Sequence, residues 1–304
     1  MSRESFRRSL RDKGPLSLKA HPSKKREGEM LHIAKSPVVT MAPTTPIYDG
    51  IQIMTKEGFR RIPIANPGTR TLEGIVTATD IIDYLGGGKK FQIIQKKFGG
   101  NIFKAINEPI KLIMTKKVVS VKTSAKISKA IELMKQQNLG GLPVVDDKNR
   151  VKAIITERDI ANMFADRISG VTVTRLMSKK VATAIPKTTT FEAARTMTTR
   201  GFRRLPIISE GKVVGIVTAM DIIRFFGSGK VFRYLKSGSI TQVLNTPAFE
   251  IATKDVATIE SDVDAGEAAK IMQEKNIGAL PVVKNGKLVG IITERDFFKI
   301  IEQT

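Results

Sequence analysis

The sequence predicts an α/β (α+β) protein made of four tandem copies of one βαββα unit. The first observation is an apolar pair followed by a hydroxyl residue, which occurs four times, at Thr40, Ser120, Thr183 and Thr258. The second is a proline 23 positions after each of these residues (40 to 63, 120 to 143, 183 to 206 and 258 to 281). The third is a signature after each proline, which reads GIVTATD, AIITERD, GIVTAMD and GIITERD. A fixed spacing repeated four times indicates one structural unit copied along the chain.

Each copy shows the expected elements in the same order. In copy two, residues 118–121 form a short β-rich run, and the apolar residues after it recur at helical spacing, which predicts a helix with one buried face. These residues are Ile127, Ala130, Ile131 and Met134. Two apolar runs then predict a β-hairpin, which in copy four turns at Asn285-Gly286, a strong signal for a two-residue turn. A final helix opens after the signature threonine.

The copies alternate in type. Copies one and three share F-R-R-h-P-I (59–64 and 202–207), where h is apolar, whereas copies two and four share N-h-G-[GA]-L-P-V-V (138–145 and 276–283). This alternation predicts a duplicated pair. The first pair spans 34–168, with units at about 34–86 and 109–166, and the second spans 169–304, with units at about 172–227 and 242–302. Residues 1–33 are basic and lack apolar periodicity, which predicts a disordered tail.

Each signature ends in T-x-x-D, which has two interpretations. It is a capping box, in which threonine and aspartate satisfy backbone groups at a helix start. It also suits a nucleotide, because a helix N-terminus attracts phosphate and an aspartate can accept hydrogen bonds from both hydroxyls of a ribose, as in dinucleotide-binding folds. Aspartate recurs in every copy and glutamate in none, which favours ribose binding, although the two roles can be divided. The aspartates are Asp80, Asp159, Asp221 and Asp296.

Adjacent arginines precede the strand proline in copies one and three only. They are Arg60, Arg61, Arg203 and Arg204. Solvated surface charge is one interpretation. Phosphate binding is favoured, because the planar guanidinium group suits phosphate recognition and the arginines occupy equivalent positions. The copies are therefore expected to differ in their preference for phosphate.

These motifs together resemble the cystathionine β-synthase (CBS) domain, repeated over residues 35–301. The four copies and the F-R-R-h-P segments resemble the nucleotide-sensing γ subunit of AMP-activated protein kinase and, more closely, its archaeal stand-alone relatives. The resemblance implies two CBS pairs that form a flat disk, with the four aspartates on ribose and the four arginines on phosphate. It also implies that eight hydroxyl residues line the ribose-phosphate: Thr40, Thr77, Ser120, Thr156, Thr183, Thr218, Thr258 and Thr293. The γ subunit lacks the ribose aspartate in one copy, whereas this chain has all four.

Composition limits the other function classes. The chain has no cysteine, and its two histidines, His21 and His32, lie in or beside the tail. It therefore has few residues suited to nucleophilic catalysis, metal binding or acid–base catalysis. A formal net charge of +22 favours polyanions in general. Aromatic residues are only 6% of the chain, which leaves little material for a platform on which nucleic-acid bases stack.

The expected function is therefore a regulatory sensor of AMP, ADP or ATP that is not an enzyme, requires no cofactor or metal and lies in the cytoplasm, away from membranes. Expected partners are the adenine nucleotides, a separate regulated protein and a second copy of the chain, with nonspecific affinity for polyanions. S-adenosylmethionine or NADH as the ligand, and nucleic-acid binding, stay open as alternatives.

Overall fold

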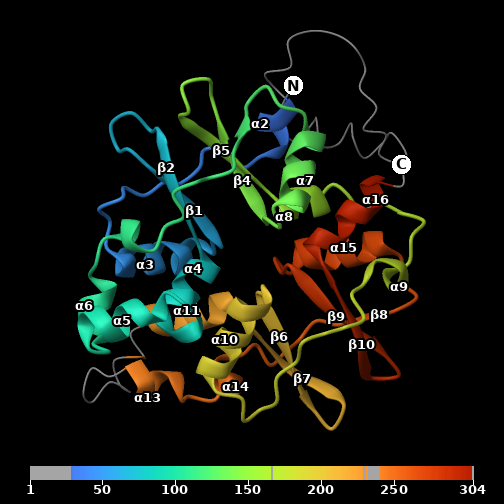
Figure 1. Ribbon diagram of the computed structural model, residues 1–304. Coiled ribbons are helices and arrows are strands. Elements are labelled where there is room, and N and C mark those ends of the chain that lie inside the picture. The colour runs from blue at the N-terminus through green and yellow to red at the C-terminus, as the bar shows by residue number, and fades with distance from the viewer. Residues whose placement is uncertain (1–28, 166, 229–230, 232–239, 303–304) are drawn as a thin grey trace. The chain divides into compact units, whose positions relative to one another are not determined.

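The computed structural model describes residues 29–165, 167–228, 231 and 240–302, and these residues form two compact units (Figure 1). Unit 1 comprises the described residues within Met1–Val38, Val119–Val181 and Ala257–Thr304. Unit 2 comprises those within Val39–Val118 and Ala182–Val256. Unit 1 thus holds the short strand beside the repeated hydroxyl residue (the hydroxyl strand), the hairpin and the helices of copies two and four. Unit 2 holds those of copies one and three. Most of the predicted tail, residues 1–28, lies outside the described residues.

Unit 2 is built from copies one and three together with the segments that follow each of them. Copy one supplies α3 (Ile47–Glu57), β1 (Arg61–Ala65), β2 (Leu72–Thr77), α4 (Ala78–Ile82) and the π-helix η1 (Asp83–Gly87). The segment after it forms α5 (Phe91–Phe98), α6 (Ile102–Ile106) and the 3-10 helix η2 (Ile110–Leu112). Copy three supplies α10 (Thr190–Arg200), β6 (Arg204–Ser209), β7 (Lys212–Thr218) and α11 (Ala219–Gly227), followed by α13 (Ile240–Leu244) and α14 (Ala248–Ile251).

Unit 1 is built from copies two and four and two short helices. Copy two supplies β3 (Val121–Lys122), α7 (Ile127–Gln136), β4 (Gly141–Val145), β5 (Val151–Thr156) and α8 (Glu157–Ala161). Copy four supplies β8 (Ile259–Glu260), α15 (Ala265–Glu274), β9 (Ala279–Lys284), β10 (Lys287–Thr293), the 3-10 helix η3 (Glu294–Phe297) and α16 (Phe298–Glu302). The added helices are α2 (Glu29–Ile33) and α9 (Val173–Leu176).

The predicted hairpins are present in all four copies, because the two strands of each pair antiparallel. In copy four the turn residues Asn285 and Gly286 both have positive φ (52° and 71°), as a two-residue hairpin turn of this type requires. The strand predicted over residues 118–121 is shorter and lies later in the chain, because β3 covers only Val121–Lys122, directly after Ser120. The hydroxyl strand pairs in parallel with the first hairpin strand over two residue pairs in copies two and four, and through a single bridge in copies one and three (Met41 to Ile64 and Ala184 to Ile207).

The helical stripes predicted from the sequence are the buried faces of α3, α7, α10 and α15. In α7, for example, Ile127, Ala130, Ile131 and Met134 are its buried residues. The small residues at these positions in α15 (Ala265, Ala268, Ala269) are likewise buried, along with Met272. Burying one stripe of each helix removes its apolar surface from water, which is the main term that stabilises a unit of this size.

Each copy donates the segment before its hydroxyl strand to the sheet of another copy. These head segments are residues 30–37, 110–117, 173–180 and 248–255. The backbone bridges are Lys35 to Ile154, Thr115 to Ile75, Ser178 to Ile291 and Thr253 to Ile216. Copies one and two therefore exchange head segments with each other, and copies three and four do the same. The pair boundaries drawn from the sequence stay a prediction.

The first head segment shows that the end of the predicted disordered tail is folded. Residues 29–33, assigned to the disordered tail, form α2, which lies beside β5 (Figure 1). Met30 and Ile33 are 0% and 1% exposed in the core of copy two. The two apolar side chains give this short helix a buried face that a search for longer periodicity overlooks.

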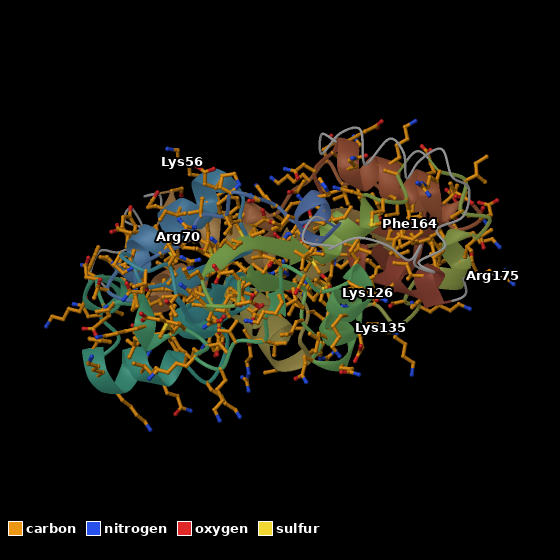
Figure 2. The ribbon with its side chains drawn as sticks, turned by 90° about the horizontal axis from the view of Figure 1, so that it is seen from above. Lys56, Arg70, Lys126, Lys135, Phe164 and Arg175 are labelled. Atoms are coloured by element: carbon orange, nitrogen blue, oxygen red, sulfur yellow. The ribbon has the colours of Figure 1, made fainter. Side chains whose placement is uncertain are left out.

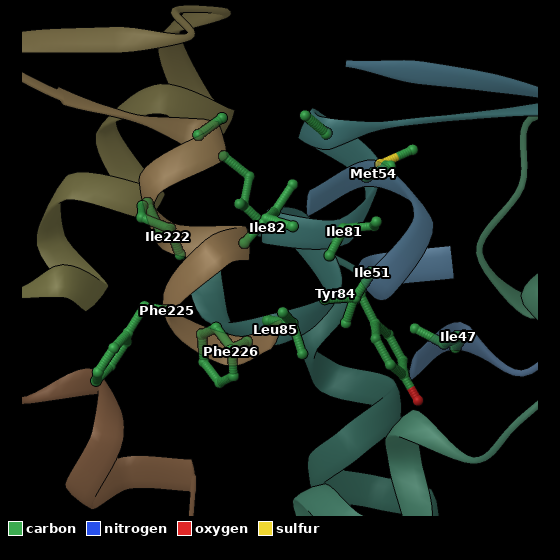
Figure 3. Close-up of a cluster of buried hydrophobic side chains, with 14 of the residues drawn as sticks. Ile47, Ile51, Met54, Ile81, Ile82, Tyr84, Leu85, Ile222, Phe225 and Phe226 are labelled. Carbon is green, nitrogen blue, oxygen red and sulfur yellow. The ribbon is translucent and has the colours of Figure 1, made fainter. Parts of the chain in front are cut away.

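Copies one and three share one hydrophobic core in unit 2 (Figure 3). Helices α4 and α11, which follow the two T-x-x-D signatures, contribute Ile81, Ile82, Ile222 and Phe226 to it. Tyr84 is fully buried there, and its hydroxyl donates to the carbonyl of Ala105 at 3.0 Å. The signature helices of copies one and three are thereby packed into the core of unit 2.

Basic side chains are spread over both units. Lys56 at the end of α3, Lys126 before α7 and Arg175 on α9 are all exposed, whereas Phe164 lies in a core of unit 1 (Figure 2). The charge therefore belongs to the folded copies and not to the N-terminal segment alone.

Candidate functional site

The T-x-x-D signature forms the same hydrogen-bonded box in every copy. In copy one, Asp80 Oδ2 accepts from the Thr77 backbone N–H at 2.9 Å and from the Thr77 hydroxyl at 2.6 Å. The corresponding pairs of distances are 2.9 and 2.7 Å at Asp159, 2.9 and 2.7 Å at Asp221, and 2.8 and 2.8 Å at Asp296. The capping interpretation of the motif is therefore confirmed, and it uses one carboxylate oxygen.

The second oxygen, Oδ1, is bound by a cationic side chain in copies one, three and four. Lys90 Nζ donates to Asp80 Oδ1 at 2.5 Å, Arg224 Nη1 donates to Asp221 Oδ1 at 2.8 Å, and Lys299 Nζ donates to Asp296 Oδ1 at 2.7 Å. The aspartate side chains are only 14%, 7% and 8% exposed, in the same order. Each of these three carboxylates thus has one oxygen committed to the helix start and one bound by a counter-ion.

Burial and the neighbouring residues shift the pKa of Asp221 in opposite directions. Loss of water around this carboxyl raises its pKa above the usual value, and the hydrogen bonds from Thr218 and the charge of Arg224 only partly oppose that effect. A hydroxyl that donates to Asp221 would favour the ionised form of the carboxyl.

The backbone brings the three repeated segments of a copy to one edge of its sheet. In copy one, Arg61 lies opposite Thr77 in the β1–β2 ladder, and the Arg60 carbonyl accepts from the Ala78 N–H at 2.8 Å. The Met41 N–H, next to Thr40, donates to the Pro63 carbonyl at 3.1 Å. The same pairings join Arg204 to Thr218 and Arg203 to Ala219 in copy three.

Copies two and four keep this framework but replace the arginines. Gly141 lies opposite Thr156, and Ala279 lies opposite Thr293. The backbone geometry is therefore common to all four copies, while the basic side chains belong to copies one and three. Arg60, Arg61, Arg203 and Arg204 are half-buried.

The eight predicted hydroxyl residues fall into two groups. The threonines of the box have their hydroxyl protons committed to the aspartate carboxylates. The other four are Thr40 and Ser120, half-buried, and Thr183 and Thr258, exposed. Within the described part of the chain, the hydroxyls of this second group make no hydrogen bond.

Sequence reasoning missed a reciprocal ion-pair cluster between copies two and four in unit 1. Arg158 Nε donates to Glu294 Oε1 at 2.6 Å, and Arg295 Nε donates to Glu157 Oε1 at 2.5 Å. The glutamate side chains are each 4% exposed. The signal was available, because only copies two and four read T-E-R-D, but the motif does not reveal that the two copies pack together.

The lysines and the arginine bound to the aspartates were missed as well. Arg224 and Lys299 lie three positions after their aspartates, where an ion pair on a helix is expected. Lys90 lies ten positions after Asp80, and sequence spacing alone does not connect these two.

The described residues offer neither a metal site nor a membrane-spanning helix. They contain no group of three His, Asp or Glu side chains that could hold a metal ion. Every described helix also falls short of the length and apolarity needed to cross a membrane.

Comparison with protein families gives one match. The CBS domain profile matches residues 30–87, 110–166, 173–228 and 248–303. Each matched range begins with a head segment and ends after a signature helix, so the structural repeat and the family repeat coincide.

Two relatives in the archaea match along nearly the whole chain. An uncharacterized protein of Methanocaldococcus jannaschii is 39% identical over 264 residues, which is 86% of this chain and 94% of that protein. An uncharacterized 33.4 kDa protein of Thermofilum pendens is 33% identical over 267 residues, 88% of this chain and 89% of that protein.

Solved structures confirm the architecture. The crystal structure of the M. jannaschii protein MJ1225, described as a candidate archaeal homologue of the γ subunit of AMP-activated protein kinase, superposes with a TM-score of 0.83 at 38% identity. The match covers 88% of this chain and 98% of that one. A Pyrococcus horikoshii protein shares the fold, with a TM-score of 0.57 at 23% identity over 88% of this chain and 97% of that one.

Proposed function

Because this chain belongs to the CBS domain family and carries four copies of the domain, we propose that it is a regulatory module that binds AMP, ADP or ATP. Each occupied copy holds a ribose through its signature aspartate. Binding shifts the chain between conformations that differ in their affinity for nucleotide, and a regulated partner protein binds these conformations with different affinities.

The observation that carries the proposal is the division of labour within each carboxylate. The helix start needs one oxygen, and Oδ2 supplies it in all four copies. Oδ1 takes no part in the cap. An aspartate with a second, separately oriented oxygen is the group that a vicinal diol requires, because its two hydroxyls both donate.

Phosphate recognition is assigned to the arginine pairs. Arg61 and Arg204 lie directly opposite the box threonines, so a nucleotide whose ribose contacts the aspartate has its phosphate within the same region of the copy. Copies two and four have Gly141 and Ala279 there, so they bind the same nucleotide with less dependence on the phosphate charge. Thr40, Ser120, Thr183 and Thr258 supply further hydroxyl groups.

The experiment is calorimetric titration of nucleotide-free protein with AMP, ADP and ATP at moderate salt. The matched control ligand is 2′-deoxy-AMP, which keeps the base and phosphate and removes one donor to the carboxylate. A hydrogen bond to a charged group contributes about 1.5–3 kcal/mol, so the deoxy form should bind about tenfold to a hundredfold more weakly.

Titrations with other ligands test the alternatives to the adenine nucleotides. S-adenosylmethionine and NADH offer the same diol without the same phosphate pattern, and tighter binding of either would replace the adenine nucleotides as the ligand. A single-stranded polynucleotide tests polyanion affinity, which should fall steeply with salt if it is nonspecific. Equal binding of AMP and 2′-deoxy-AMP would reject the aspartate–diol contact.

A further inference from the structure

We propose that Lys90 and Lys299 couple ligand binding at the signature aspartates to the exchanged head segments. The inference rests on the proposed function. Each lysine bridges two groups: the Oδ1 atom of an aspartate and a backbone carbonyl of a head segment. A ligand that takes the carboxylate therefore removes one of the two contacts that hold the lysine in place.

The two bridges have the same geometry. Lys90 Nζ donates to Asp80 Oδ1 at 2.5 Å and to the Ile113 carbonyl at 2.7 Å. Lys299 Nζ donates to Asp296 Oδ1 at 2.7 Å and to the Leu176 carbonyl at 2.5 Å.

The two carbonyls occupy equivalent positions, since Ile113 begins I-M-T-K-K-V and Leu176 begins L-M-S-K-K-V. Two residues later, each head segment joins the sheet through the backbone bridges of Thr115 and Ser178. Each lysine therefore binds its head segment next to the place where that segment is attached.

The lysines reach this position from different parts of the fold. Lys90 lies just before α5, and its backbone N–H is held by Asp83 Oδ1 at 3.0 Å. Lys299 lies within α16, three residues after Asp296. The repeat therefore does not account for the shared geometry, because these residues are not equivalent copies of one position. What the bridges share is their pair of acceptors.

Counting acceptor sites shows why a bound diol competes with the lysine. A carboxylate has about four acceptor sites, two on each oxygen. In Asp80, Oδ2 already accepts two hydrogen bonds from Thr77, and Oδ1 accepts one from Lys90. One site remains for a ligand with two hydroxyl donors. A diol that donates twice must displace the lysine from Oδ1, which leaves the ammonium with the carbonyl of Ile113 alone.

Copy three provides an internal comparison. Arg224 binds Asp221 Oδ1 as the lysines bind their aspartates. Among the described residues, however, Arg224 makes no hydrogen bond to a head-segment carbonyl. Copy three should therefore show competition between cation and diol without any effect on the head segment that joins its sheet, residues 248–255.

The test measures amide hydrogen exchange and adenosine binding on the full chain, with adenosine chosen because it has no phosphate. In the wild type, adenosine should speed exchange in residues 110–117 and 173–180. The Lys90→Met variant should exchange faster in 110–117 before ligand is added, with no further response there. It should also bind adenosine about tenfold more tightly at copy one, since a charge-assisted competitor has been removed.

The matched control is Lys89→Met, which removes the same charge from the exposed neighbouring residue and should leave both readouts unchanged. Lys299→Met repeats the test in unit 1 on residues 173–180, so the proposal does not depend on one variant folding. Weaker or unaltered adenosine binding in both lysine variants would overturn it, as would unaltered exchange in both head segments when the wild type binds adenosine.

Failure of the proposed function would give a different experimental result from failure of the lysine bridge. If the wild type binds neither adenosine nor AMP, adenine-nucleotide sensing is rejected and the ligand competition with it. If only AMP binds, AMP takes the place of adenosine in both measurements. The lysine bridge is then judged by the ligand-free proteins alone, in which equal exchange of residues 110–117 in the wild type and in Lys90→Met would reject the bridge too.

Discussion

Removing Arg295 should destabilise unit 1 more than a typical surface substitution. Its guanidinium donates to Glu157 Oε1 at 2.5 Å and to the Leu139 carbonyl at 2.8 Å, and it also contacts the Asn138 side chain. In Arg295→Met, the Glu157 carboxylate loses this arginine as its cationic partner while remaining inside the protein, because its side chain is only 4% exposed.

The expected magnitude follows from this burial. Breaking a buried ion pair costs about 3–5 kcal/mol, because the remaining buried charge loses its partner's charge and hydrogen bond. Arg295 itself is 30% exposed, so water reaches part of the site and the lower limit applies, at about 3 kcal/mol. Removing both charges, in Glu157→Gln with Arg295→Met, leaves no buried carboxylate at this position and should cost less than the single change, about 1 kcal/mol.

Urea denaturation followed by circular dichroism measures these differences in the free energy of unfolding. Arg158→Met provides a second instance, because Arg158 and Glu294 form the reciprocal pair. Arg175→Met removes an exposed arginine and serves as the control. A loss below about 0.5 kcal/mol for Arg295→Met, the range of ordinary surface changes, would refute the reasoning. A double variant no more stable than the single one would refute it too.

Two further predictions concern packing and pH. Gly290→Ala should cost about 1 kcal/mol, because its Cβ would lie 2.5 Å from Met177 Sδ and 3.1 Å from the Ser178 carbonyl oxygen, so the methionine side chain must move. Gly215→Ala, where the nearest atom is at 3.3 Å, should cost less, and equal urea midpoints would contradict this. Burial raises the folded-state pKa of Asp221 above 3.8, so the stability gained by protonating it is fully present below pH 3.8 and is lost as the pH rises through the folded pKa. The stability of Asp221→Asn relative to the wild type should therefore increase over that interval in urea titrations at successive pH values, and a flat or falling difference would exclude the effect.

Local sequence patterns predicted the local structure well. Helical spacing identified the buried face of α7, and Asn285-Gly286 identified the hairpin of copy four, because both features depend on residues close in sequence. The threonine–aspartate box was predicted for the same reason. The exchange of head segments was not, since a short segment such as α2 carries too few apolar residues to indicate which sheet it joins.

The candidate site was predictable only in part. The sequence singled out the aspartates and the arginine pairs as candidates, and the strand register places Arg61 and Arg204 opposite the box threonines of copies one and three. The sequence could not assign a partner to the second carboxylate oxygen. Lys90 and Asp80 meet because the chain turns between α4 and α5, and that turn depends on packing within unit 2.

The binding roles of the four aspartates are tested most directly by counting bound AMP in four single variants. Asp80→Asn, Asp159→Asn, Asp221→Asn and Asp296→Asn each keep an oxygen for the helix start and lose the charge that a diol requires. Calorimetry gives the number of AMP molecules bound by each variant and by the wild type. The account predicts that the losses in the four variants add up to the wild-type number. The same number and affinity in all four variants would contradict it.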